Sequence, residues 1–223
     1  MIVKFLILFT ATIAAFWISA ICGGGASLVL IPLLNWLLPT SVVPFSLTIG
    51  TFISSASKIA VFKKYIRWKI FWWFVPFSVP AVLLGGWLMK YINPLYLQFM
   101  VGLLLLANIP ELFKTPKQQK SKEKPYPKFV LATVGFFAGF ISGITGAIGL
   151  LFNRFYLRYG LTKEEIIATR AANEIFLHIL KLTIYLLLGL YTTNALWLGI
   201  TIAIASVISS YTVKYILPFI SEF

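Results

Sequence analysis

The stretch from Ala168 to Tyr185 reads ATRAANEIFLHILKLTIY, and four of its residues are ionisable: Arg170, Glu174, His178 and Lys181. At about 100° per residue of an α-helix, these four positions fall within a sector of roughly 80°. Arg170 and Glu174, and likewise Glu174 and His178, are four residues apart, so an Arg–Glu–His ladder is available to them. The stretch therefore predicts a helix with one charged face and an otherwise apolar surface.

The rest of the chain has the composition of a membrane protein. Of the 223 residues, 60% are hydrophobic and 11% are charged, whereas soluble chains carry about 25% charged residues. Several apolar runs approach the roughly 20 residues that span a bilayer, and continuous runs of this length are not the alternating strands of a membrane barrel. Because a bare charge near the bilayer centre costs about 3 kcal/mol or more, the charged face must border the protein interior or a hydrated cavity.

Apolar segments follow one another along the whole chain. The pattern predicts an all-α membrane helix bundle of about eight or nine membrane segments. Two of them are too short to cross, and each follows a glycine break, CGGGAS at 22–27 or GITGAIG at 143–149. The segments are expected at 2–21, 26–38, 41–62, 69–91, 94–110, 129–146, 148–159, 164–190 and 192–216. Whether 2–38 makes two crossings or a re-entrant loop stays open.

The two ends of the chain resemble each other. Residues 17–50, WISAICGGGASLVLIPLLNWLLPTSVVPFSLTIG, can be laid over residues 140–173, FISGITGAIGLLFNRFYLRYGLTKEEIIATRAAN. Each copy has a glycine break, a short helix, a turn and a longer helix, which is the pattern of the inverted repeats of secondary transporters. We expect a first membrane repeat with an extra helix at 1–110, a linker at 111–128 and a second repeat at 129–223.

Basic residues gather in two connections. Ten of the 19 lysines and arginines lie in 63–69 and 111–128, and the positive-inside rule makes both loops cytoplasmic. This orientation gives a cytoplasmic C-terminus and an external N-terminus. The net charge of +13 does not predict nucleic-acid binding, since no basic domain stands outside the spans. A single cysteine, Cys22, excludes an internal disulfide, and one histidine with no aspartate predicts neither a metal site nor a cofactor.

Further candidate site residues come from the glycine breaks and from 41–62. Amides at a helix start bind anions, so Gly24 and Gly25, with Ser27 as a cap, are candidates in the first half. Four more complete the set: Gly146 and Gly149 in the second break, and Thr51 and Ser54 on a hydroxyl-rich helix. Lys58 on that helix is expected to extend toward the membrane surface, with the alternative that it lines a cavity together with Thr51 and Ser54, which share its face of the helix. Structural alternatives stay open: a salt-bridge network, helix packing or flexible hinges.

The balance of charge at this predicted cavity is positive, which favours an anionic substrate. We expect Arg170 to be the main anion contact and Lys181 the second. Glu174 and His178 would orient these groups or carry protons, because histidine titrates near neutral pH.

The chain resembles the sulfite exporter TauE/SafE family over nearly its whole length. The resemblance rests on ISAICGGGASLVLIPLL at 18–34, GFFAGFISGITGAIG at 135–149 and IIATRAANEIF at 166–176. It implies a multi-helix permease that moves a sulfur-containing anion, sulfite or an organosulfonate, across the cytoplasmic membrane of a prokaryote. The second copy departs from the first, since it keeps only Gly146 and Gly149, and Phe155 stands where the first half has Pro32.

These observations predict a secondary transporter of a small anion that works by alternating access. The alternative is a translocase for a polyprenyl phosphate or lipid carrier, which also needs a cationic cavity. An intramembrane enzyme is less favoured, because the chain has no aspartate and one histidine and so lacks an HExxH zinc site. A coupling proton and a homodimer remain open.

Overall fold

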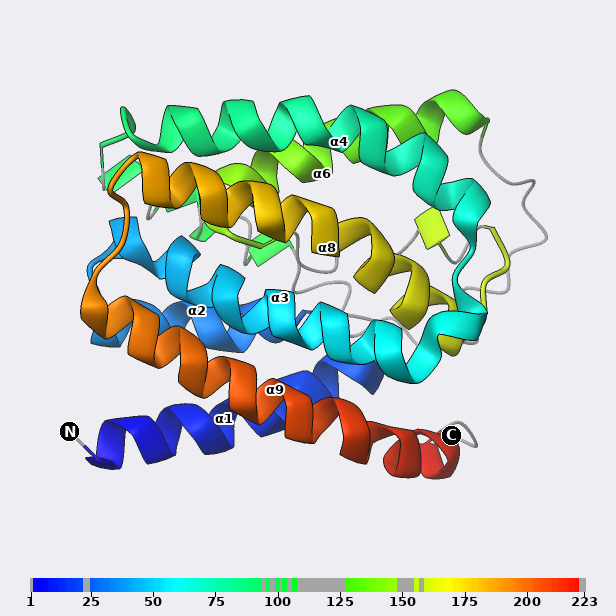
Figure 1. Ribbon diagram of the computed structural model, residues 1–223, viewed down its shortest axis with the longest axis horizontal. Coiled ribbons are helices and arrows are strands. Elements are labelled where there is room, and N and C mark those ends of the chain that lie inside the picture. The colour runs from blue at the N-terminus through cyan, green and yellow to red at the C-terminus, as the bar shows by residue number, and fades with distance from the viewer. Residues whose placement is uncertain are drawn as a thin grey trace.

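The computed structural model of the chain describes residues 2–21, 25–93, 95–96, 99–100, 102–103, 106–107, 127–147, 155–156 and 159–220. Within these ranges the regular elements are helices and no strand occurs, so the all-α prediction is confirmed. The elements in chain order (Figure 1) are α1 (Ile2–Ile21), α2 (Ala26–Leu37), η1 (Thr40–Val42), α3 (Val43–Phe62), η2 (Lys63–Tyr65), α4 (Trp68–Met89), α6 (Lys128–Thr145), α8 (Lys163–Leu187) and α9 (Thr193–Ile220).

Seven of the predicted segments have a counterpart among these helices. The segment 2–21 coincides with α1, and 26–38 ends one residue beyond α2. The predicted segments 94–110 and 148–159, and the linker 111–128, lie mostly outside the described residues, so the expected number of eight or nine segments stays a prediction.

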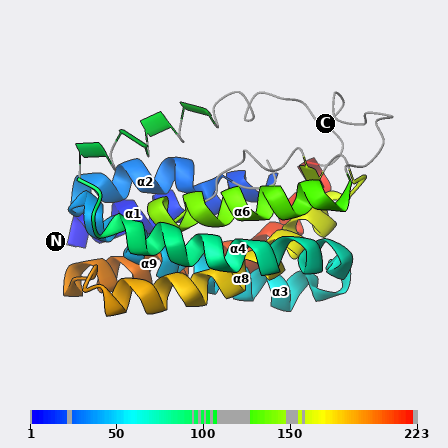
Figure 2. The same ribbon diagram turned by 90° about the horizontal axis from the view of Figure 1, so that it is seen from above.

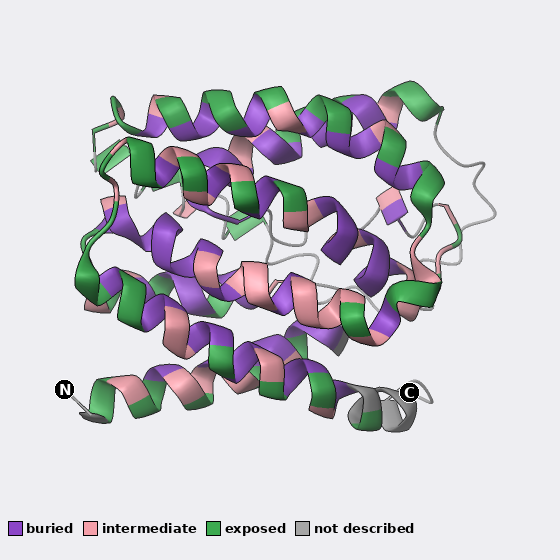
Figure 3. Ribbon diagram, in the orientation of Figure 1, coloured by how far each residue is buried: buried purple, intermediate pink, exposed green. Residues whose placement is uncertain are grey.

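The described helices have the length and surface of membrane spans. Five stretches are long and apolar enough to cross a bilayer: Val3–Ala20, Thr40–Tyr65, Trp68–Met89, Lys128–Thr145 and Thr193–Val213. Large apolar side chains face outward, among them Trp72, Phe129 and Leu187, which are 67%, 76% and 79% exposed, and exposed positions follow the outer faces of the helices (Figure 3). The chain is therefore a multi-pass membrane protein, as predicted.

Helices α4 and α6 pack closely and run in the same direction. Three glycines of α6, at four-residue spacing, each lie so near an α4 carbonyl that a Cβ would collide with it, and their order is the same along both helices: Gly135 at Phe74, Gly139 at Ser78 and Gly143 at Val82. Figure 2 shows the two helices side by side. Small residues of this kind allow membrane helices to approach at backbone distance.

Helices α1, α3 and α9 form a second parallel group. The Trp17 indole N–H of α1 donates to Thr212 Oγ1 of α9 at 2.8 Å, and Gly50 of α3 lies against Ile202 of α9. Each helix of this group runs from the end of the molecule that carries the N-terminus to the end that carries the C-terminus (Figure 1).

Helix α8 is parallel to α4 and α6 and antiparallel to α3. The rings of Phe71 in α4 and Phe176 in α8 are 5.5 Å apart, whereas the backbone N–H of Arg67, just after α3, donates to Thr169 Oγ1 near the start of α8 at 3.0 Å. Six of the described helices thus form two antiparallel groups, α1–α3–α9 and α4–α6–α8, and the short helix α2 packs against α1 and α3. Buried apolar clusters fill both, the larger around α1, α2, α3 and α9 and a smaller one among α4, α6 and α8.

Local chemistry fixes the start of α8 beside the loop that precedes α4. Thr162 and Glu165 form a capping box, in which the Glu165 N–H donates to Thr162 Oγ1 at 3.3 Å and the Thr162 N–H donates to Glu165 Oε2 at 3.0 Å. Glu165 also pairs with Arg67. Because such a box satisfies helix-start donors that would otherwise lack partners, it sets where the charged stripe of α8 begins.

Candidate functional site

A cavity of about 80 Å³ lies where α1, α2, α3, α6 and α8 meet. A water molecule requires roughly 10–15 Å³ on this measure, so the cavity has room for several waters or one compact ion. Nine of the predicted site residues line it: Gly25, Ser27, Thr51, Ser54, Gly146, Arg170, Glu174, His178 and Lys181. The other two, Gly24 and Gly149, lie outside the described residues.

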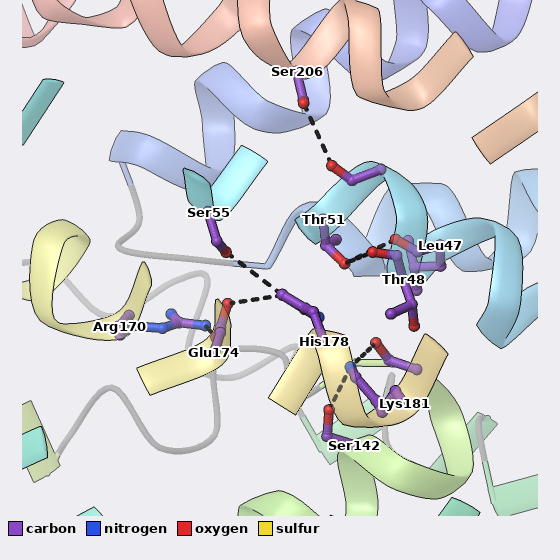
Figure 4. A network of polar contacts seen from close by, with 12 residues as sticks. Leu47, Thr48, Thr51, Ser55, Ser142, Arg170, Glu174, His178, Lys181 and Ser206 are labelled. Atoms are coloured by element: carbon purple, nitrogen blue, oxygen red, sulfur yellow. Dashed lines mark hydrogen bonds and ion pairs between the residues drawn. The ribbon is translucent and has the colours of Figure 1, made fainter. Parts of the chain in front are cut away.

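The charged stripe of α8 forms the ladder that its spacing predicts. Arg170 donates to Glu174 Oε1 at 3.1 Å, and the other carboxylate oxygen of Glu174 lies 4.0 Å from His178 Nε2. His178 Nε2 is also 3.5 Å from Ser55 Oγ of α3 (Figure 4). The stripe thus faces the hydroxyl-bearing side of α3, which keeps its charges away from lipid.

Lys181 is fully buried and bonds to the glycine break that ends α6. Its ammonium donates to Ser142 Oγ at 2.8 Å and to the carbonyl oxygen of Gly146 at 2.9 Å (Figure 4). A cation is favourable at this place because the last carbonyls of a helix carry partial negative charge.

The glycine breaks differ from the prediction in two respects. Helix α2 begins at Ala26 with Gly25 as its N-cap, and no side chain caps it. Ser27 is therefore a residue of the first turn and not the expected cap. Gly146 is the C-cap of α6, and its N–H donates to Ser142 O at 2.9 Å, so this amide is already used and its carbonyl is what Lys181 contacts.

Both breaks do require glycine. Gly25 and Gly146 have φ values of 96° and 79°, the left-handed region that glycine occupies without steric cost. A Cβ at Gly146 would also come within 2.8 Å of the Pro44 Cα at the start of α3.

Lys58 lines the cavity, which was the less favoured of the two positions that the sequence left open for it. Its side chain does not extend to the membrane surface: it lines the cavity, and its ammonium lies 5.1 Å from the centre of the Phe16 ring of α1. Its closeness to Lys63 in the sequence had favoured a surface position. The overlay of the two halves indicates the cavity position. That overlay ends at Gly50 and Asn173, and when it is continued by eight residues it pairs Lys58 with Lys181.

Among the residues that the structure describes, two polar atoms at the cavity are buried and have no hydrogen-bond partner: Ser54 Oγ and His178 Nδ1. Thr51 differs, since its hydroxyl donates to Leu47 O within α3 at 2.8 Å. Buried polar groups in proteins nearly always have partners. Ser54 and His178 are therefore the residues beside the cavity whose buried polar atoms lack a partner among the described residues.

The cavity carries more positive than negative charge. Among the described residues that line it, Lys58, Arg170 and Lys181 bring three cationic groups and Glu174 the one carboxylate. Ionisable groups inside a membrane bundle commonly mark a substrate or ion pathway, so the fold and the cavity are those expected of a membrane transporter.

A comparison with protein families identifies the kind of transporter. The family model described as "Sulfite exporter TauE/SafE" matches residues 7–222. The chain belongs to this family, whose members are membrane exporters of sulfite and related anions and not enzymes. No curated protein and no solved structure matches the chain.

Proposed function

We propose that this protein is a secondary transporter that moves a small sulfur-containing anion, sulfite or an organosulfonate, by alternating access at the central cavity. The excess of positive charge in that cavity carries the proposal. Arg170 is the main anion contact and is held by Glu174, and Lys181 contributes the second positive charge. Ser54 Oγ and His178 Nδ1, which have no partner among the described residues, supply polar contacts.

The size of the cavity favours a compact ion. A volume of about 80 Å³ suits sulfite or a short organosulfonate, and a lipid-linked phosphate would need an opening between helices for its chain. The family membership points to the same substrates.

Alternating access is supported by the way the helices pair. The pairs α1 with α9, α3 with α9, and α3 with α8 are all in contact. In the overlay of the two halves, α6 is the counterpart of α1, α8 of α3, and α9 of α4. When each helix is replaced by its counterpart, the three contacts become α6 with α4, α8 with α4, and α8 with α3. These three pairs are also in contact. The two halves of the chain thus make the same set of packing contacts.

The directions of the helices support an inverted relation between these halves. Members of the first group, α1, α3 and α9, run opposite to α6, α8 and α4 (Figure 1). An axis in the membrane plane that relates two such halves is the symmetry on which many secondary transporters rely, because it makes the inward-open and outward-open states equivalent.

We infer that the end of the bundle with the loop 63–69 is cytoplasmic. Helices α4 and α6 are parallel, so this loop and Lys128 at the end of the linker lie on the same side, as the positive-inside rule requires of two basic connections. The membrane is then the cytoplasmic membrane of a prokaryote, with the N-terminus outside.

The proposal is tested with purified protein in proteoliposomes. Uptake is measured for sulfite, a short organosulfonate, sulfate, phosphate and a short carboxylate, with empty liposomes as the control. We expect saturable uptake of a sulfur anion that the other sulfur anion inhibits. Arg170→Ala should abolish it, and Glu174→Gln should weaken it.

Two results would contradict the proposal. One is uptake no greater than in empty liposomes for every sulfur anion. The other is uptake that Arg170→Ala and Glu174→Gln both leave unchanged, which would remove these residues from the site.

A further inference from the structure

Two lysines occupy corresponding positions in the two halves. The overlay that pairs Trp17 with Phe140 also pairs Ser19 with Ser142 and Lys58 with Lys181. Both lysines and both serines line the cavity.

The two lysines nevertheless have different partners. Lys181 bonds to Ser142 Oγ at 2.8 Å and to the Gly146 carbonyl. In the described part of the chain Lys58 makes no hydrogen bond or ion pair; it lies over the Phe16 ring, and no bond joins it to Ser19. One lysine is thus fixed to the broken helix of its own half, whereas the other is available to a ligand.

The cavity shows the same asymmetry. Arg170 and Ala171 of α8 line it, whereas their counterparts on α3, Leu47 and Thr48, do not line it and are completely buried. The cavity therefore includes the point where the equivalent residues Ser55 and His178 meet and extends from there toward the start of α8, whereas no described residue near the start of α3 lines it.

We propose that Lys58 and Lys181 contact the transported anion in turn. In the state described here Lys58 faces the anion and Lys181 is held by Ser142. In the opposite state Lys58 binds Ser19, and Lys181 leaves Ser142 and faces the anion on the other side. This inference rests on the proposed function, and it adds Lys58 and Ser19 to the transport machinery.

The physical basis of the exchange is the equivalence of the two lysine–serine pairs. Each state keeps one lysine–serine bond, so the change replaces a charged hydrogen bond with an equivalent one. A transporter needs two states of similar free energy, because a ligand shifts an equilibrium only by its difference in affinity for the two states. Replacing one of the two serines with alanine should then favour the state in which the other serine is bonded to its lysine.

The test measures which side of the cavity is open. Cys22 is replaced with serine, and a single reporter cysteine is introduced as Ala171→Cys, which lines the cavity here, or as its counterpart Thr48→Cys, which does not. The rate of reaction with a water-soluble thiol reagent is compared in Ser19→Ala and Ser142→Ala. Thermal unfolding of every variant verifies that it is folded.

The two serine variants should shift the reporters in opposite directions. Ser142→Ala removes a bond of the present state, so it should slow the labelling of Ala171→Cys and speed that of Thr48→Cys. Ser19→Ala should do the reverse. One hydrogen bond from a charged donor corresponds to a change in the equilibrium of roughly tenfold or more. Lys181→Met should behave as Ser142→Ala does, and Lys58→Met as Ser19→Ala does.

Shifts in the same direction, or unchanged labelling in both serine variants, would overturn the exchange. Sulfite uptake is measured on the same preparations, so the two proposals are judged separately. Opposite shifts without sulfite uptake would support the exchange and reject the proposed substrate. Uptake without opposite shifts would support the proposed function and reject the exchange.

Discussion

Ser55 Oγ and His178 Nε2 lie 3.5 Å apart in the buried centre of the molecule, and the two residues are 123 positions apart in the chain. The same offset lays Trp17 over Phe140 in the overlay of the two halves. Residues related by a two-fold axis meet their own counterparts only near that axis. The contact therefore marks where such an axis would pass, between the hydroxyl-bearing face of α3 and the charged face of α8.

Arg170→Ala should lower both stability and transport, and a second substitution should separate the two effects. Arg170 and Glu174 are paired and only 13% and 22% exposed, so loss of the guanidinium leaves a carboxylate with a poorly compensated charge. We expect a loss of about 1–3 kcal/mol in the free energy of unfolding. Adding Glu174→Gln should restore most of it, while sulfite uptake stays at least roughly tenfold below wild type, as one lost charged contact implies.

Arg67→Ala is the matched control for that experiment. Arg67 pairs with Glu165, but its side chain is 59% exposed, and exposed pairs contribute less than about 1 kcal/mol. Stability should change little and uptake not at all. If Arg67→Ala impaired uptake as strongly as Arg170→Ala, the effect of Arg170 could not be assigned to the cavity.

Ser54→Ala should weaken anion binding without destabilising the protein. Ser54 Oγ is buried and has no partner in the part of the chain that the structure describes, so its removal relieves an unsatisfied group, and the melting temperature should stay the same or rise. Binding, followed by calorimetry with sulfite, should weaken by roughly tenfold, the equivalent of one hydrogen bond to a charged ligand.

Ser78→Ala is the comparison for Ser54→Ala, because the Ser78 hydroxyl is also buried but bonds to Phe74 O in its own helix. It should leave sulfite affinity unchanged. Equal affinities in wild type and Ser54→Ala would remove Ser54 from the site.

Gly139→Ala should destabilise the contact between α4 and α6. The added Cβ would collide with the backbone of Ser78, and overpacking of this kind costs typically about 1–3 kcal/mol. Gly102→Ala is the control, since no atom of the described residues lies within 4 Å of the Cβ it would add. Thermal unfolding in detergent should give a lower midpoint for Gly139→Ala alone; equal midpoints would mean that the two helices are not in backbone contact.

Glu174→Gln should abolish proton movement coupled to transport. Among the described residues, the charged or titratable groups that share the cavity with Glu174 are Lys58 from α3 and Arg170, His178 and Lys181 from α8. The Glu174 carboxylate, which lies between Arg170 and His178, can take up and release a proton, whereas the Arg170 guanidinium stays protonated. A pH-sensitive dye inside proteoliposomes should respond to the addition of an organosulfonate that stays ionised. A response that persisted in both Glu174→Gln and His178→Asn would exclude a coupling role for either residue.

The sequence predicts the helices of this fold well, because each apolar run ends at a glycine break, a turn or a basic loop. It also predicts the charged face of α8, because placing Arg170, Glu174 and His178 on one face of a helix requires only the helical period. Which helix packs against which other helix cannot be predicted in this way. The spacing of Gly135, Gly139 and Gly143 indicates close packing, but nothing in it specifies α4.

The part of the site that sequence reasoning missed depends on contacts between segments. Whether Lys58 extends to the surface or inward is decided by α1 and α8, which pack around it and leave a cavity there. The role of Gly146 depends on Lys181, 35 residues away, whose ammonium donates a hydrogen bond to the Gly146 carbonyl. The glycine pattern alone had predicted that the Gly146 amide would bind the anion.

Uptake of radiolabelled sulfite into proteoliposomes tests the central claim most directly, because it does not depend on whether transport moves net charge. We expect saturable uptake by the wild-type protein, none above background in empty liposomes, and loss of uptake in folded Arg170→Ala. Wild-type uptake equal to that of empty liposomes, at every pH and from both sides of the membrane, would contradict sulfite transport through this cavity.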